Sequence, residues 1–109
     1  ATLLRKALKR KQPRYLCSIN LGELIYISRR RLEEVGKLKL LSKIQLLGIT
    51  ILEASNGRVY RAAELKANYA ISYADCFALA CALEYDLPLV TGDTEFEKVD
   101  TLVDVQWIR

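Results

Sequence analysis

The segment Leu87-Pro88-Leu89-Val90-Thr91-Gly92-Asp93 carries the clearest structural signal in the chain. Its apolar residues are typical of a buried strand of a parallel sheet. Gly92 then turns the chain, and Asp93 follows directly before a short helix that we expect over residues 94–99. In open parallel α/β sheets, ligands bind outside the carboxyl ends of the strands. We therefore expect Asp93 to lie at a functional edge of the sheet.

The remainder of the 109 residues alternates helices with short apolar strands. We expect further strands at 14–18, 49–54 and 103–108. We expect further helices at 2–11, 20–35 (capped by Asn20 and ended by Gly36), 37–47, 58–68 (after a turn at Ser55-Asn56-Gly57) and 72–85. This order predicts a single α/β domain over residues 1–109, with helices on both faces of a three-layer parallel sheet.

Glu23 and Asp75 share the placement of Asp93, because each begins a helix after a strand or loop. The helical neighbours of Asp75 and of Glu23 are apolar, and burying an unpaired charge beside them would be costly. A divalent cation would offset that cost. Each of the three acids also admits a purely structural role at a helix start, as a cap or as the partner in a capping box. Three acids in the same placement nevertheless favour a metal site.

The chain contains no histidine. This excludes Ser-His-Asp hydrolases, histidine-pair ribonucleases and HExxH zinc proteases. Neither GxxxxGK[ST] nor GxGxxG occurs, so the usual phosphate loops are missing as well. Any metal chemistry would therefore use oxygen ligands and a hard cation such as Mg²⁺. The three cysteines lie in apolar contexts, which predicts buried, reduced thiols.

Charge is distributed unevenly along the sequence. Residues 1–48 carry twelve Lys/Arg against three acids, a net +9, whereas residues 49–109 carry five against ten, a net −5. A basic half beside an acidic half favours contact with a polyanion such as RNA. The candidate RNA-binding residues are Arg10, Lys11, Arg14, Arg29 and Arg30. No run of 18 apolar residues and no secretory signal occur, and we expect a cytoplasmic protein without a membrane span.

Three motifs in their order and spacing resemble a PIN domain of the VapC toxin-like group, over nearly the whole chain. They are Ser18-Ile19-Asn20-Leu21-Gly22-Glu23-Leu24, Tyr73-Ala74-Asp75-Cys76-Phe77-Ala78-Leu79-Ala80 and Leu89-Val90-Thr91-Gly92-Asp93-Thr94-Glu95-Phe96. The resemblance implies a ribonuclease that depends on Mg²⁺ or Mn²⁺. It also implies a homodimer and a small antitoxin partner.

By this resemblance Glu23, Asp75 and Asp93 are three of the four acidic residues of the family, and Thr91 is its strand-end hydroxyl. From their places in the chain, Ser18 and Thr91 are suited to position a metal-bound water or a phosphate. Glu95, two residues after Asp93, is a candidate auxiliary ligand.

The sequence departs from the family pattern at its start. PIN domains begin with a strand that bears the first acid and lies between the strands formed here by residues 15–18 and 87–91. This chain opens on a helix instead, and we expect a truncation that leaves a gap in the sheet. The alternatives are a first strand supplied by another chain and a natural variant that lacks it. Two rival hypotheses remain: a catalytically inactive RNA- or protein-binding module whose acids only cap helices, and a flavodoxin-like nucleotide-binding regulator. The missing phosphate loop counts against the regulator.

Overall fold

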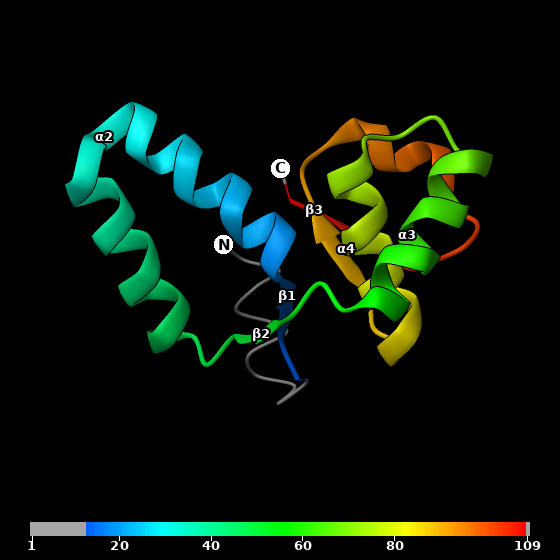
Figure 1. Ribbon diagram of the computed structural model, residues 1–109, viewed down its shortest axis with the longest axis horizontal. Helices are drawn as coiled ribbons and strands as arrows, with labels where there is room; N and C mark the ends of the chain where they lie inside the picture. Colours follow the sequence, from blue (N-terminus) through cyan, green and yellow to red (C-terminus); the bar gives the residue numbers. More distant parts are fainter. Residues whose placement is uncertain (1–12, 109) are drawn as a thin grey trace. The chain divides into compact units, whose positions relative to one another are not determined.

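The computed structural model describes residues 13–108 (Figure 1), so the helix expected over 2–11 lies outside the described residues. These residues fall into two compact units, Pro13–Ala54 (the N-terminal unit) and residues 55–108 (the C-terminal unit). The N-terminal unit contains β1 (Tyr15–Cys17), α2 (Ser18–Leu46) and β2 (Thr50–Leu52). The C-terminal unit contains α3 (Asn56–Asn68), α4 (Tyr73–Tyr85), β3 (Leu89–Thr91), the 3₁₀ helix η1 (Thr94–Val99) and β4 (Val105–Trp107).

All strand pairing in residues 13–108 is parallel. In the N-terminal unit Leu16 of β1 is in register with Ile51 of β2, and in the C-terminal unit Val90 of β3 is in register with Gln106 of β4. The predicted α/β class with parallel strands is confirmed. The strands of the described residues form two separate two-stranded sheets, one in each unit. The expected single sheet with a gap in it stays a prediction. None of the helices in the described part of the chain is long and apolar enough to cross a membrane.

The helix α2 consists of two arms with a break at Glu33, whose φ of 57° and ψ of −147° are not helical. Two helices were indeed expected, but the predicted break at Gly36 was wrong. Gly36 lies buried in the second arm, where a Cβ atom would be 2.5 Å from the carbonyl oxygen of Ser28. The glycine therefore serves the close approach of the two arms. The predicted cap was also wrong, because α2 starts two residues before Asn20, after Cys17.

Replacing Gly36 by alanine should destabilise the protein by about 1–3 kcal/mol, because the new methyl group overlaps the backbone at Ser28. The matched control is Gly22→Ala in the same helix, where a Cβ would meet no atom within 4 Å. That variant should gain roughly 0.5–1 kcal/mol from the better helix propensity of alanine. Urea unfolding of both variants is the measurement, and equal effects of the two would contradict this account of Gly36.

The core of the C-terminal unit is the helix α4, which is buried on nearly all sides. It packs against α3 and β3. Its fully or nearly fully buried residues are Cys76, Phe77, Leu79, Ala80, Cys81 and Ala82. A helix that is apolar all round belongs in a protein interior. Ser55 caps α3 by accepting a hydrogen bond from the Arg58 amide, so the turn expected at residues 55–57 is instead the start of this helix.

The three cysteines are free and buried, as the sequence predicts. Burial raises the pKa of the Cys76 thiol, and the nearby Asp75 carboxylate acts in the same direction while Lys66 opposes it. A raised pKa keeps the thiol protonated and unreactive.

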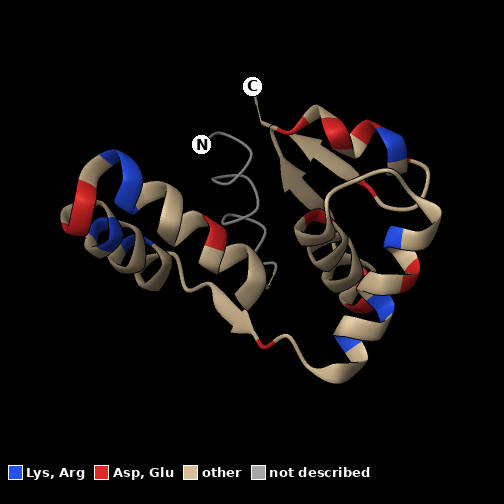
Figure 2. Ribbon diagram, turned by 45° about the horizontal axis from the view of Figure 1, so that its top comes forward, with Lys and Arg blue, Asp and Glu red and all other residues tan. Residues whose placement is uncertain are grey.

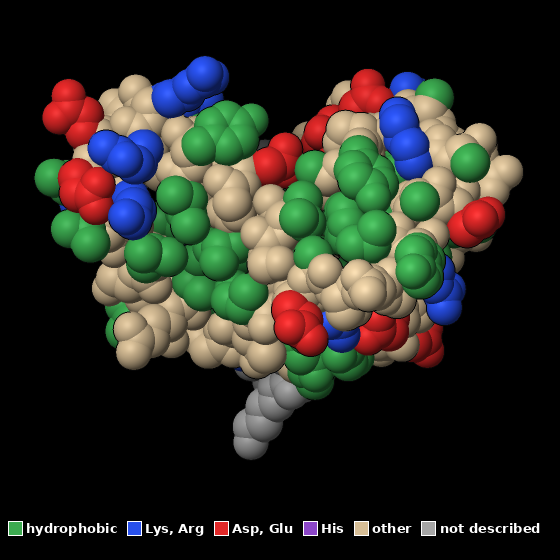
Figure 3. Space-filling model, in the orientation of Figure 1, with side chains coloured by type: hydrophobic (Ala, Val, Ile, Leu, Met, Phe, Trp, Pro, Cys, Tyr) green, Lys and Arg blue, Asp and Glu red, His purple; other side chains and the backbone are tan. Residues whose placement is uncertain are grey.

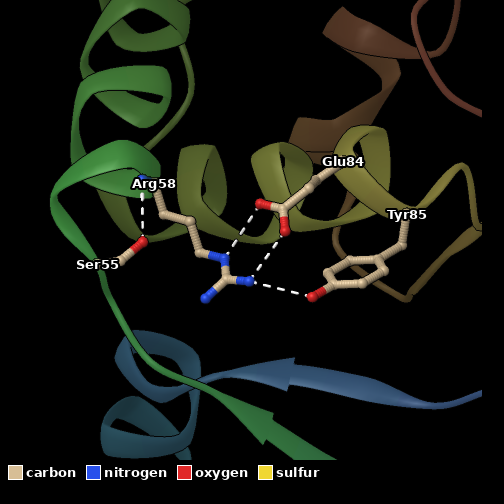
Figure 4. A network of polar contacts seen from close by, with 4 residues as sticks. All are labelled: Ser55, Arg58, Glu84 and Tyr85. Atoms are coloured by element: carbon tan, nitrogen blue, oxygen red, sulfur yellow. Dashed lines mark hydrogen bonds and ion pairs between the residues drawn. The ribbon is translucent and has the colours of Figure 1, made fainter.

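Arg58 links α3 to the end of α4 (Figure 4). Its Nε and Nη2 donate to the two carboxylate oxygens of Glu84, at 3.1 and 2.9 Å, and Nη2 also donates to the Tyr85 hydroxyl at 3.1 Å. The hydrogen bond from Arg58 lowers the pKa of Glu84. Such a bidentate arrangement is among the strongest geometries for an arginine–carboxylate pair.

This pair should make stability depend on acidity. Because the pKa of Glu84 is lowered on folding, its contribution is present above the ordinary glutamate pKa of about 4.3 and is lost as the pH falls through the lower folded value. The Glu84 side chain is 38% exposed, so solvent screening limits the contribution to about 1 kcal/mol or less. Urea unfolding at pH 7 and pH 3 should show a larger advantage of the native chain over Glu84→Gln at pH 7 than at pH 3. An equal difference in stability between the native chain and Glu84→Gln at both pH values would contradict the proposed contribution of the Arg58–Glu84 pair.

Candidate active site

Asp75 lies in the first turn of α4. The Ser72 hydroxyl caps this helix by accepting a hydrogen bond from the Asp75 amide at 3.1 Å. The Asp75 side chain is half-buried. The N-terminus of a helix is where a carboxylate is electrostatically favoured, so the fold holds an acid here beside an otherwise apolar core. The capping interaction that the Ser-x-x-Asp pattern predicts is present.

Asp93 follows β3 directly and is fixed by two hydrogen bonds. Its amide donates to the Thr91 hydroxyl at 3.0 Å, and its Oδ1 accepts from the Glu95 amide at 2.9 Å. The second bond caps η1, so the structural role considered for Asp93 is real. The cap uses one carboxylate oxygen, and the Asp93 side chain is exposed. These two hydrogen bonds hold the Asp93 amide and Oδ1, and so they also orient the second carboxylate oxygen.

The segments that carry Asp75 and Asp93 meet at one end of the C-terminal unit. Figure 1 shows the end of β3, the helix η1 and the first turn of α4 there. Lys98 of η1 joins these segments, since its Nζ donates to the carbonyl oxygen of Ala70 at 2.9 Å and to Oε2 of Glu95 at 3.0 Å. The Glu95 carboxylate is therefore engaged by a lysine, and its role as an auxiliary ligand stays a prediction.

Sequence reasoning missed the lysines of this end. Lys98 lies in a polar stretch, and nothing in its spacing distinguishes it from a solvated surface lysine. The same is true of Lys66 in α3, whose Nζ donates to the carbonyl oxygen of Ile71 at 2.7 Å. Both partners are backbone atoms of the α3–α4 loop, which no sequence pattern identifies.

Glu23 and Ser18 belong to the N-terminal unit. Ser18 is the first residue of α2, and Glu23 lies half-buried in the second turn of the same helix. Their convergence with Asp75 and Asp93 of the other unit stays a prediction. Within residues 13–108, no three acidic or cysteine side chains stand together as a metal site. The donor set is nevertheless made of carboxylate and hydroxyl oxygens, which by chemistry fits a hard divalent cation rather than zinc.

The candidate RNA-binding residues differ in their surroundings. Arg14 donates to the carbonyl oxygen of Leu47 and so holds the end of α2. Arg29 and Arg30 are exposed beside the break in α2, where Figure 2 shows basic residues gathered in the N-terminal unit. Arg29 lies 3.5 Å from Glu34, and Arg30 lies 5.6 Å from the centre of the Tyr26 ring. Arg10 and Lys11 lie outside the described residues.

These features define a small parallel α/β domain in which acids follow a strand and start a helix at one end of the C-terminal unit. The chain belongs to the PIN domain family, whose model matches residues 1–102. The match spans both units.

Two solved structures share the fold. The crystal structure of VapBC2 from Rickettsia felis bound to a promoter DNA fragment has a TM-score of 0.74 at 23% identity, over 98% of this chain and 83% of that chain. The crystal structure of DNA-bound VapBC from Salmonella typhimurium has a TM-score of 0.67 at 19% identity, over 84% of this chain and 73% of that chain. A search of curated proteins gave no significant match.

The two roles of Asp93 can be separated by substitution. Asp93→Asn keeps an oxygen that accepts from the Glu95 amide, whereas Asp93→Ala removes it. Because an asparagine caps about as well as an aspartate, we expect Asp93→Ala to lose about 1 kcal/mol of stability and Asp93→Asn only a few tenths. Urea unfolding in a chelator measures this. Equal losses in the two variants would show that the capping bond contributes nothing.

Proposed function

We propose that this protein is a Mg²⁺- or Mn²⁺-dependent endoribonuclease of the VapC toxin type, with Glu23, Asp75 and Asp93 as its metal ligands. The observation that supports this most is the placement of Asp75 and Asp93. Both acids lie at the same end of the C-terminal unit, each at the start of a helix, in a chain of the PIN domain family.

The residues of this end have distinct tasks in the proposed reaction. A bound divalent cation supplies Lewis acidity and a more acidic water for phosphodiester hydrolysis. Asp93 would hold the cation with one carboxylate oxygen, while Oδ1 is fixed by the η1 cap. Thr91 orients Asp93 through the backbone amide. Asp75 contributes its carboxylate from the end of a rigid core helix, which limits how far it moves on metal binding.

Substrate binding would use the basic N-terminal unit. Arg29 and Arg30 are exposed, and Arg31, Lys37 and Lys39 follow them in the sequence. Arginine side chains of this kind hold phosphates of an RNA backbone without reading its sequence.

An antitoxin is the partner that we propose for the apolar surface of α2. Several large side chains of this helix are exposed, among them Leu32, Val35 and Leu38 at 58–60% and Leu46 at 84%. Figure 3 shows hydrophobic side chains on the face of the N-terminal unit that it displays. Exposed apolar side chains that gather on one face are typical of an interaction surface. The two structural relatives are VapBC complexes, which supports an antitoxin, and the homodimer implied by the family is a second occupant for this surface.

The alternative function is a catalytically inactive binding module of the same fold. The specific observation in its favour is that Ser72 and Asp93 do act as helix caps, so the acidic motifs have a structural use without any metal.

RNA cleavage decides between these functions. In Mn²⁺, the native chain should cut an end-labelled structured RNA, and Asp75→Asn and Asp93→Asn should each slow cleavage more than about 100-fold, beyond the effect typical of an outer-shell residue. The exposed Asp104 of the same unit provides the matched control, and Asp104→Asn should cut at the native rate. A chelator should abolish cutting.

Cutting that survives in Asp93→Asn or in chelator would rule out the proposed metal site. If the native chain does not cut, the assay is repeated on a fusion with a PIN-domain first strand that bears the fourth acid. Activity in the fusion restores the nuclease hypothesis, and its absence supports the inactive binding module.

A further inference from the structure

Two lysines hold the loop that leads into α4. Lys66 donates to the carbonyl oxygen of Ile71 at 2.7 Å, and Lys98 donates to that of Ala70 at 2.9 Å. These carbonyls directly precede Ser72, the residue that caps α4. The position of the cap, and with it the first turn that carries Asp75, is therefore fixed from both α3 and η1.

Lys98 makes a second contact, a 3.0 Å ion pair with Glu95. The amide of Glu95 in turn donates to Oδ1 of Asp93. A continuous path of polar contacts thus runs from Asp93 through Glu95 and Lys98 to the backbone at Ala70, two residues before the α4 cap. All of its members belong to the C-terminal unit.

We propose that Lys98 is a positioning residue that sets the separation of Asp75 and Asp93. The inference rests on the proposed function, because it assigns to both acids a shared cation. Two carboxylates that share a site repel each other when they are not neutralised. Lys98 donates hydrogen bonds to the segment before α4 and to η1, and so it opposes the separation of Asp75 and Asp93 before a cation binds. It does so through Glu95 and Ala70.

The competing explanation is that Lys98 is an ordinary surface lysine. Its side chain is 50% exposed, and exposed ion pairs contribute little to stability. The two explanations predict opposite signs for cation affinity. If Lys98 were only a nearby positive charge, its removal would strengthen Mn²⁺ binding, since like charges repel. If it positions the ligands, its removal weakens binding.

Mn²⁺ affinity of the full 109-residue chain, measured by the spin-resonance signal of free Mn²⁺, tests this. Lys98→Met should weaken binding about 10-fold or more, which is the usual effect of losing an outer-shell partner. Lys98→Arg keeps the charge and donors for both contacts and should restore most of the affinity. Lys43→Met removes the same charge from an exposed position of α2 that has no part in the proposed site, and it should leave the affinity unchanged.

Unfolding in chelator accompanies each variant to show that it is folded. If Lys98→Met does not fold, Lys98→Gln, which keeps a donor for the Ala70 carbonyl but loses the ion pair, takes its place with weakened binding expected. Equal or tighter Mn²⁺ binding in the folded variant overturns the role of Lys98 and leaves the proposed function standing. A native chain that binds no Mn²⁺, or binds it as well after Asp93→Asn, overturns the proposed function and this inference together.

Discussion

Burial of α4 is the constraint on which the rest of the C-terminal unit depends. This helix is apolar on all sides and must be covered, so α3 and β3 pack against it and η1 contributes the buried Phe96 and Val99. A charge is tolerated in such a helix only at its ends. Asp75 therefore lies in the first turn, where the helix dipole favours a carboxylate, and Glu84 lies in the last turn, where Arg58 compensates for its charge.

The strand pair β3–β4 completes the frame around the candidate site. Parallel pairing brings Thr91 level with Trp107, and the amide of Ile108 donates to the Thr91 carbonyl at 2.9 Å. A Cβ on the next residue, Gly92, would lie 3.2 Å from the carbonyl oxygen of Ile108, a tight contact that glycine avoids. The glycine thus lets the chain turn against β4 and deliver Asp93 immediately after the strand. The position of Asp93 at the end of β3 therefore follows from the packing of the backbone and not from the aspartate itself.

The sequence alone predicts those features of the fold that depend on the types and spacing of neighbouring residues. The apolar strands, the cap at Ser72, the cap at Asp93 and the short helix after it all follow from residue type and spacing, and the structure contains them. The break at Glu33 is different, because a glutamate in that backbone conformation is held by the packing of two helical arms rather than by its own preference. The roles of Lys66 and Lys98 escape prediction for the same reason. Each depends on a loop carbonyl brought near by the tertiary fold.

Capping and the proposed metal binding are compatible roles for the acids of this site. The cap at Asp93 engages only Oδ1, through the Glu95 amide, and so orients the other oxygen at little cost. At α4 the serine is the cap acceptor, because its hydroxyl accepts a hydrogen bond from the Asp75 amide. A ligand that is already ordered loses less entropy when it binds a cation. Under the proposed function, the structural interactions at the starts of η1 and α4 preorganise these carboxylates for a cation, so that the same short motifs satisfy both roles.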